Sequence, residues 1–355
     1  MNTQELVFTN KVGETIDALV AKINPSKVFV LVDVNTASFV LPRLQALSTA
    51  VAGATVITTK AGDMHKNLDS TQAIWKRLGD EGATRHSLLI NVGGGVVTDM
   101  GAFAAATFKR GISFINVPTT LLGAVDASVG GKTGINFGNL KNEIGVFCQA
   151  DTVVVSTIFF NTLTSEELRS GYAEMLKHAL LKDAASFDSL IARHVEDIDP
   201  ESLLGLLEQS VLVKKNIVDT DPCEKSIRKS LNLGHTAGHA FESLALERKS
   251  PIPHGYAVAY GLVTELVLSH IKLGFSSEVL HRFAAYVKEV YGAFEFTCDD
   301  YSRLIALMRH DKKNLSAADI NFTLLRSIGD VQIDCVAGEE DIKTALDITR
   351  DLLGI

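Results

Sequence analysis

Five short runs of apolar residues, rich in valine and isoleucine, constrain the fold of this chain more than any other feature of its sequence. The runs are continuous and do not alternate with polar residues, which is typical of strands buried on both faces of a parallel sheet. Stretches with the apolar spacing of helices lie between some of them, at residues 68–78 and 96–108. The runs occupy residues 27–33, 54–59, 87–92, 112–117 and 151–156. This order predicts an α/β domain with a mostly parallel, Rossmann-like sheet.

The pattern changes after about residue 160 to one of successive helices. Apolar spacing typical of helices covers residues 165–181, 200–218, 235–246, 257–273 and 277–291, and one β-like run follows at 320–325. A chain of 355 residues is longer than one hydrophobic core usually supports. We therefore predict two domains: an α/β domain at residues 1–160 and a mainly α-helical domain at residues 161–355.

Composition excludes several classes of protein. The formal net charge of −8 argues against a general nucleic-acid-binding surface. No window reaches 18 uninterrupted apolar residues, because Thr264 and Glu265 interrupt the richest stretch, so we expect no membrane span. The four cysteines are far apart and form no CxxC pair, which is typical of reduced thiols, and the first residues do not have the pattern of a secretory signal. We expect a soluble cytoplasmic protein.

Residues 231–242, Leu-Asn-Leu-Gly-His-Thr-Ala-Gly-His-Ala-Phe-Glu, indicate a metal site. A helix would put His235 and His239 on one face, His254 opens the next apolar segment, and Glu174 lies in a strongly helical stretch upstream. Two histidines and one glutamate are a common catalytic zinc set, with a fourth position open for substrate or water. A helical histidine is more often an ordinary polar residue, so spacing alone leaves both interpretations open.

A glycine-rich turn follows the third apolar run. Gly93, Gly94 and Gly95 would let a pyrophosphate approach the backbone N–H groups at a helix N-terminus. The turn departs from the GxGxxG fingerprint, so a purely structural turn stays open. Asp33, at the end of an earlier strand, has the position of a ribose hydroxyl acceptor, although an aspartate after a strand is common.

Residues 118–134 predict a long polar, glycine-rich loop whose single cation, Lys132, suggests a phosphate cradle. The loop lacks the spacing of a Walker motif, so ATP use is not supported. Further cations stand at the edges of other motifs and suggest one small polyanionic substrate, because hydrogen bonds to charged groups contribute about 1.5–3 kcal/mol each. They are Arg110, Lys177, Lys214, Arg228 and Lys312.

Together these motifs closely resemble the 3-dehydroquinate synthase family over nearly the whole chain. Seven ordered segments carry the resemblance: residues 93–111, 118–136, 141–147, 170–178, 229–242, 253–261 and 310–314. The resemblance implies an N-terminal NAD domain, a C-terminal metal and substrate domain, an active site in the cleft between them, and a homodimer.

The resemblance also implies a role for each matching residue. The metal ligands, for Zn or Co, would be Glu174, His235 and His254. The NAD contacts would be Asp33, Asp63, Lys66, Gly94, Gly95, Asp99, Thr119, Thr120, Asp126, Lys141, Phe159 and Thr162. The substrate contacts would be Arg110, Lys132, Asn142, Lys177, Lys214, Arg228, Asn232, His239 and a lysine of the Lys312–Lys313 pair, preferably Lys312. Glu224 and His239 match proton-transfer positions, and Lys132, Lys177, Arg228 and Asn232 would hold the reacting acid and its phosphate. Arg110 would reach into the partner subunit's site.

The implied reaction converts 3-deoxy-D-arabino-heptulosonate 7-phosphate into 3-dehydroquinate and phosphate, in the shikimate pathway to chorismate and the aromatic amino acids. NAD would be reduced and reoxidised within one turnover. Some positions depart from the usual family pattern: Asp63 replaces a glutamate, residues 148–150 replace His-Gln-Pro, Ser156 stands where aspartate is frequent, and residues 163–167 lack a Leu-Pro pair.

Three other functions stay open. Another sugar-phosphate cyclase, such as a 2-deoxy-scyllo-inosose or 2-epi-5-epi-valiolone synthase, would share fold, NAD and metal, although Arg228 and Asn232 favour a substrate with a carboxylate. A metal-dependent polyol dehydrogenase would consume NAD and would not need so many substrate cations. A metal-stabilised binding protein without catalysis fits least, because no metal or substrate motif residue is missing.

Overall fold

The computed structural model describes residues 4–138, 140–309 and 320–355, and the chain divides into two compact units. Unit 1 comprises Met1–Thr164 and Asp199–Val211. Unit 2 comprises Ser165–Ile198 and Leu212–Ile355. Residues 199–211 therefore belong with unit 1, although they follow the boundary expected near residue 160.

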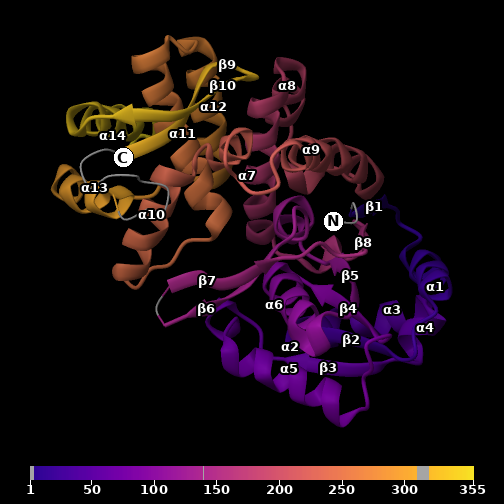
Figure 1. Ribbon diagram of the computed structural model, residues 1–355. Helices are drawn as coiled ribbons and strands as arrows, with labels where there is room; N and C mark the ends of the chain where they lie inside the picture. The colour runs from indigo at the N-terminus through magenta and orange to yellow at the C-terminus, as the bar shows by residue number, and fades with distance from the viewer. Residues whose placement is uncertain (1–3, 139, 310–319) are drawn as a thin grey trace. The chain divides into compact units, whose positions relative to one another are not determined.

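Unit 1 is built on a six-stranded sheet in the order β1-β8-β5-β4-β2-β3, and all of its strand pairs are parallel (Figure 1). Five of the strands lie where the apolar runs predict them, and the parallel Rossmann-like fold is confirmed. The sixth, β1, is a short edge strand whose apolar run is too brief to read from the sequence. The strands are β1 (Glu5–Phe8), β2 (Val28–Asp33), β3 (Thr55–Thr59), β4 (Leu88–Gly93), β5 (Ser113–Pro118) and β8 (Thr152–Val155).

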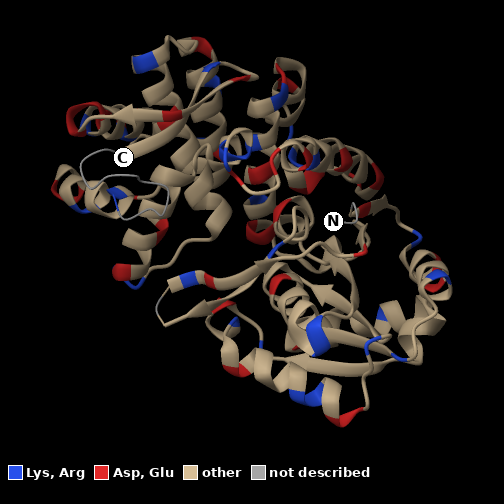
Figure 2. Ribbon diagram, in the orientation of Figure 1, with Lys and Arg blue, Asp and Glu red and all other residues tan. Residues whose placement is uncertain are grey.

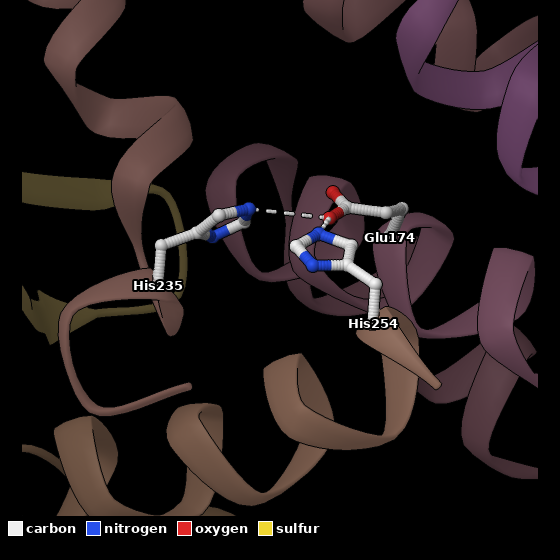
Figure 3. Close-up of side chains that lie close together, drawn as sticks. All are labelled: Glu174, His235 and His254. Carbon is white, nitrogen blue, oxygen red and sulfur yellow. Dashed lines mark ion pairs between the residues drawn. The ribbon is translucent and has the colours of Figure 1, made fainter. Parts of the chain in front are cut away.

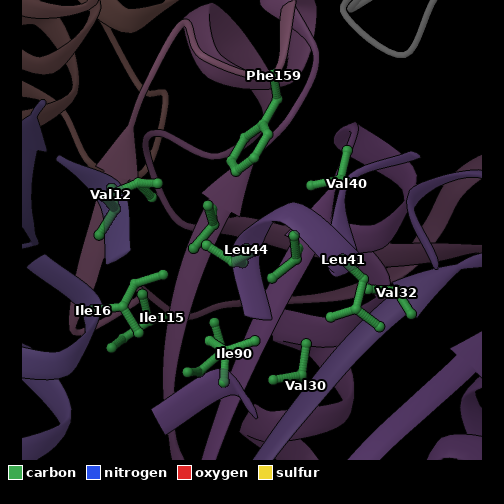
Figure 4. Packing of buried hydrophobic residues seen from close by; sticks show 14 of the residues in the cluster. Val12, Ile16, Val30, Val32, Val40, Leu41, Leu44, Ile90, Ile115 and Phe159 are labelled. Atoms are coloured by element: carbon green, nitrogen blue, oxygen red, sulfur yellow. The ribbon is translucent and has the colours of Figure 1, made fainter. Parts of the chain in front are cut away.

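Helices cover both faces of this sheet. Strand residues such as Val30, Ile90 and Ile115 join Ile16 of α1 and Leu44 of α3 in one buried apolar cluster (Figure 4). On the other face α6 packs closely, since a Cβ at Gly101 would lie 2.1 Å from Oδ1 of Asn91. The helices of unit 1 are α1 (Val12–Ile23), α2 (Val34–Phe39), α3 (Leu41–Leu47), α4 (Thr49–Ala52), α5 (Leu68–Asp80) and α6 (Gly95–Thr107).

The expected loop at residues 118–134 is wrong in part. Its middle is a π-helical turn, η3 (Gly123–Ala127), and its end is the start of strand β6 (Lys132–Phe137). Strand β6 pairs antiparallel with β7 (Leu140–Phe147), which was not predicted. Two glycines face each other in this hairpin, since a Cβ at Gly145 would lie 2.2 Å from the carbonyl oxygen of Thr133. The glycines that suggested a loop therefore allow two strands to approach closely.

Unit 2 is mainly α-helical, as predicted, and α11 is its central helix. Helices α7, α10, α12 and α14 and strand β9 all pack against α11, which is buried along most of its length (Figure 1). The antiparallel pair β9–β10 joins this layer. The elements are α7 (Ser165–Lys182), α8 (Ala184–Ile191), α10 (His235–Glu247), α11 (His254–Leu273), α12 (Ser277–Tyr291), α13 (Tyr301–Arg309), β9 (Ile320–Ser327), β10 (Asp330–Ala337) and α14 (Glu339–Leu353); α9 (Pro200–Thr220) contributes its second half.

The described residues also bear on the apolar stretches, the cysteines and the charge discussed above. None of the described helices is both long and apolar enough to span a bilayer. The four cysteines are free. Basic and acidic segments are interspersed along the helices of each unit in Figure 2, and this view shows no continuous basic stripe over the described residues.

Candidate functional site

Three side chains from three helices of unit 2 converge on one point (Figure 3). Glu174 lies in the middle of α7, and His235 and His254 are the first residues of α10 and α11. Oε1 of Glu174 is 3.3 Å from Nε2 of His235 and 3.7 Å from Nε2 of His254. The sequence places α11 too late, at Ala257, whereas His254 is part of the helix itself.

Two glycines determine where the histidines lie. Gly234 precedes His235 and has a φ of +79°, which only glycine adopts without strain. Gly255 follows His254 and lies so close to α7 that a Cβ would be 1.9 Å from the carbonyl oxygen of Ser170. The Gly255 N–H also donates to Oγ of Ser170 at 3.0 Å. Backbone contacts that no larger residue permits therefore bring His254 to the helix that carries Glu174.

Each imidazole is held in one orientation by an acceptor on its far side. Nδ1 of His235 is 3.0 Å from the carbonyl oxygen of Leu233. Nδ1 of His254 is 3.2 Å from Oε2 of Glu242. A carbonyl and a carboxylate can only accept, so each Nδ1 carries the hydrogen. The Nε2 atoms that face Glu174 are therefore the ones available as metal ligands.

Glu174 is fully buried, and its electrostatic surroundings favour the carboxylate. Burial alone would raise the pKa of Glu174, but the Lys177 ammonium and His235 outweigh it and hold the pKa well below its usual range. Lys177 forms an ion pair with Oε2, the oxygen that faces away from the imidazoles. Burial and Lys177 lower the pKa of His235 to about 4, whereas at His254 the two carboxylates Glu174 and Glu242 overcome burial and raise the pKa to about 10.

The trio fits a divalent metal on its own geometry. Both carboxylate oxygens of Glu174 are buried, and Oε1, which faces the two imidazoles, accepts no hydrogen bond from the described residues. Ligand atoms around a tetrahedral zinc lie roughly 3.3 Å apart, because each bond is about 2.0–2.1 Å long. The observed separations of 3.3 and 3.7 Å are close to that spacing. A cation between these atoms would satisfy the buried oxygen that the protein leaves without a donor.

Four of the other residues expected at the substrate also lie in unit 2. His239, one turn along α10, is exposed, and its ring centroid is 5.3 Å from that of His235 and 5.9 Å from that of His254. Lys214 and Arg228 are buried. Asn232 donates to Oε1 of Glu224 at 3.2 Å.

Asp221, which was not predicted from the sequence, stabilises the turn that carries Glu224 and Arg228. Its carboxylate accepts from the backbone N–H groups of Lys225, Ser226 and Arg228. Burial would raise the pKa of Asp221, but these donors hold it below its usual value. Glu224 lies in the turn with a φ of +58°, so the turn bends sharply at the expected proton-transfer residue.

In unit 1, three of the residues expected to bind NAD, Asp33, Gly94 and Gly95, lie at the carboxyl ends of β2 and β4. The chain leaves β2 for β3 on one side, and β4 then pairs with β2 on the other side, which makes this the switch point of the sheet. Ligands of open α/β sheets bind at such a point. Asp33 ends β2 and caps α2 through Thr36, and Gly94 is the N-cap of α6.

The glycine turn touches the segment after β5. The Thr119 N–H donates to the carbonyl oxygen of Gly93 at 3.0 Å, and a Cβ at Gly94 would lie 3.1 Å from the Thr120 side chain. A larger residue at position 94 would therefore require the Thr120 side chain to move slightly. Gly95 begins α6, whose first N–H groups are the anion-binding end of the helix.

A polar network beside α6 joins other residues of the NAD and substrate sets. Nζ of the buried Lys66 lies 2.6 Å from Oδ2 of Asp99 and 2.5 Å from Oδ1 of Asn142. Asp63 lies close to Lys141 and accepts from the amide of Asn136. Asn142, expected at the substrate, is thus linked to two residues expected at the cofactor.

The remaining expected residues are placed as follows. Asp126 lies in η3, Lys132 begins β6 and is exposed, and Thr162 is exposed after β8. Phe159 has no exposed surface and belongs to the apolar cluster of Figure 4. Arg110 is exposed in a turn after α6. Lys312 lies outside the described residues.

Two carboxylates near the metal trio were not predicted, although the sequence contains a feature that points to each of them. Glu242 lies seven residues after His235, on the helix face that already carries His239. Glu265 is the charge that interrupts the apolar stretch of α11, and it is fully buried. A buried charge inside an apolar helix requires partners, which is the observation that would have singled it out.

Comparisons with known proteins agree with this arrangement. The family models described as 3-dehydroquinate synthase N-terminal and C-terminal match residues 56–170 and 171–314. The chain is 46% identical over 355 residues to the 3-dehydroquinate synthase of Parabacteroides distasonis, covering 100% of both chains. The structure of 2-epi-5-epi-valiolone synthase from Streptomyces hygroscopicus, with NAD⁺ and Zn²⁺ bound, superposes with a TM-score of 0.87 at 25% identity, covering 99% of this chain and 98% of that one. A 2-deoxy-scyllo-inosose synthase with NAD⁺ and Co²⁺ shares the fold, with a TM-score of 0.85 at 20% identity, covering 98% and 96%.

Proposed function

The chain belongs to the 3-dehydroquinate synthase family and is an enzyme of that kind, and we propose that Glu174, His235 and His254 hold the divalent metal of its reaction. The reaction converts 3-deoxy-D-arabino-heptulosonate 7-phosphate into 3-dehydroquinate and phosphate, within the shikimate pathway. The convergence of two Nε2 atoms on one buried carboxylate carries the proposal about the metal.

The metal would act as a Lewis acid that holds the substrate hydroxyls and acidifies the one to be oxidised. Lys177 maintains Glu174 as a carboxylate, and the backbone carbonyl of Leu233 and the carboxylate of Glu242 aim the two imidazoles. Either Zn or Co suits two imidazoles and a carboxylate.

Unit 1 supplies the place for NAD, at the switch point of its sheet. NAD would accept a hydride from the substrate and return it later in the same turnover, so no NADH accumulates. Gly94 and Gly95 lie at the N-terminus of α6, whose first backbone N–H groups would bind the pyrophosphate. One oxygen of Asp33 caps α2, which leaves the second oxygen as an acceptor for a ribose hydroxyl.

The other residues of unit 2 position the substrate and move protons. The exposed imidazole of His239 lies beside the metal ligands and can take a proton from a substrate hydroxyl there. Glu224 is held by Asn232 and would act on a second substrate proton. The cations Lys177, Lys214 and Arg228 would bind the carboxylate and phosphate. Lys132, which belongs to unit 1, is a further phosphate contact that the family resemblance implies. Such binding orients the substrate through several successive steps.

His235→Ala tests the metal site. We expect the purified variant to lose stoichiometric metal, measured by atomic emission, and to release no phosphate from the heptulosonate phosphate. Wild-type enzyme should release phosphate without accumulating NADH, as followed by absorbance at 340 nm. Stoichiometric metal in a folded variant would remove the metal assignment. NADH accumulation at the rate of turnover would instead indicate a polyol dehydrogenase.

We also propose a homodimer in which Arg110 acts in the neighbouring active site. The turn that carries it contains two successive non-glycine residues with positive φ, Lys109 at +51° and Arg110 at +69°. Such a backbone is kept only where its surroundings require it, and it is a common feature of functional segments.

A further inference from the structure

We propose that Glu265 is a positioning residue for the metal site, which it serves by fixing the N-terminus of α10 and hence the place of His235. The inference rests on the metal assignment proposed above and adds a residue that the family resemblance does not supply. Glu265 lies on α11, eleven residues after His254, and its side chain is fully buried.

The carboxylate of Glu265 bridges the start of α10. Oε2 accepts from the Gly234 N–H at 2.6 Å, and Oε1 accepts from the Ala237 N–H at 3.1 Å. The first N–H groups of a helix have no partner within the helix, and a negative charge is favoured beside them. His235 lies between the two bonded residues, so the N–H group just before it and the one two residues after it are both tied to one side chain of α11.

Close packing against α11 restricts the position of α10. A Cβ at Gly261 would lie 2.0 Å from the carbonyl oxygen of Gly234 and 2.6 Å from the N–H nitrogen of Gly238. The two helices therefore touch through their backbones one turn before Glu265 on α11. Gly234 itself occupies a left-handed conformation that the Glu265 bond to its N–H helps to hold.

The position of His235 is sensitive to this support for two reasons. His235 is the first residue of α10, so it lies where a helix frays when its N-cap is weak. Gly234, the N-cap, has no side chain to accept from the helix, and no side-chain cap bond is present there. Glu265, which lies on another helix, therefore accepts the hydrogen bonds that an N-cap side chain would otherwise accept. Displacement of a metal ligand by about 1 Å is enough to weaken a site.

A metal titration of the apoprotein separates this role from a purely structural one. The variants are Glu265→Gln, which removes the charge and one acceptor, and Glu265→Asp, which keeps the charge one methylene shorter. Asp183→Ala is the matched control, because Asp183 accepts from the Ser186 N–H at the start of α8, which carries no expected site residue. The readouts are Zn²⁺ affinity by chelator competition, the visible d–d spectrum of the Co²⁺ form, and thermal stability.

We expect Glu265→Gln to weaken Zn²⁺ binding by about 10- to 100-fold and to shift the cobalt bands, because supporting groups of metal ligands have effects of that size. Glu265→Asp should retain part of the affinity, and Asp183→Ala should lose stability while binding Zn²⁺ within about twofold of wild type. If Glu265→Gln does not fold, Glu265→Asp carries the test. Wild-type affinity and an unchanged cobalt spectrum in the folded Glu265 variant would overturn the inference. If His235→Ala also keeps its metal, the site itself is wrong, which distinguishes the two failures.

Discussion

A fully buried carboxylate is costly unless charges and donors offset its loss of hydration, and Glu174 shows how this chain offsets that cost. One oxygen faces Lys177 and the other faces two imidazoles. The lysine side thus balances the charge of the acid, and the imidazole side leaves room for a cation. At the scale of the residue, function depends on which of the two oxygens meets which partner.

Glu242→Gln should weaken metal binding without unfolding the protein. The carboxylate fixes Nδ1–H of His254 at 3.2 Å, and an amide can present its NH₂ group there instead of an acceptor. We expect Zn²⁺ affinity to fall by about 10- to 100-fold. Glu247→Gln is the control on the same helix, because Glu247 pairs with Arg303. Equal zinc affinities for the two variants, by isothermal titration, would contradict a role for Glu242.

At the scale of the element, short helices depend on their caps. The four-residue helix α4 is held from outside by Asp17 of α1. Its carboxylate accepts from the N–H groups of Thr49 and Ala50 and from Oγ of Ser48. Burial raises the pKa of Asp17, but these hydrogen bonds outweigh burial and lower it below its usual value.

Asp17→Ala should therefore destabilise unit 1 in a pH-dependent way. A lowered native pKa means that the contribution is present above the unfolded value of about 3.9 and is lost as the pH falls through the native pKa. We expect the free energy of unfolding to fall by about 0.5–2 kcal/mol at neutral pH, the range for loss of an N-cap. Urea unfolding followed by the single tryptophan, Trp75 in α5 of unit 1, measures it.

The control for this prediction is Asp80→Ala, which removes an exposed partner of Lys76 and should change stability by less than about 0.5 kcal/mol. The difference between wild type and Asp17→Ala should shrink in acid, at about pH 3, where the carboxyl group is increasingly protonated in the unfolded chain. A difference that stays constant with pH would show that Asp17 contributes through packing and not through its charge.

At the scale of the whole molecule, the residues proposed to bind the metal in unit 2 and those proposed to bind NAD in unit 1 come from separate parts of the chain, each with its own packed core. The two units bring these residues together in different ways. Unit 1 uses the ends of parallel strands, which meet at one edge of the sheet. Unit 2 uses the ends of α10 and α11, brought to α7 by glycine contacts.

Mixing two inactive variants tests the proposed exchange of Arg110 between subunits. In a heterodimer of Arg110→Ala and His235→Ala, one site would combine an intact metal set with an intact Arg110 from the other chain. Random mixing makes half of the dimers mixed, so about a quarter of wild-type phosphate release should return. The separate variants are the controls. No recovery after verified subunit exchange would show that Arg110 acts within its own chain.

Several features were readable before any fold was known. The continuous apolar runs predicted five of the six parallel strands, and the periodicity of the second half predicted α7, α9, α10 and α12 near their observed bounds. His235 and His254 stood out as metal-binding residue types next to glycines, and Glu174 stood out as a carboxylate in a helical stretch. The fold predictions succeeded because burial on both faces and helical period are properties of short segments, whereas the metal ligands stay a prediction.

Only the tertiary structure decided how those segments support one another. The β6–β7 hairpin looked like a loop because its glycines permit close strand pairing as readily as they permit turns. The roles of Glu242 and Glu265 depend on partners from another helix. Glu242 accepts a hydrogen bond from a ring nitrogen of His254, and Glu265 accepts from two backbone N–H groups at the start of α10. Local sequence states which groups a segment offers. Which donor each acceptor meets depends on helix crossings that bring together residues far apart in the chain, and those crossings exist only once the core has packed.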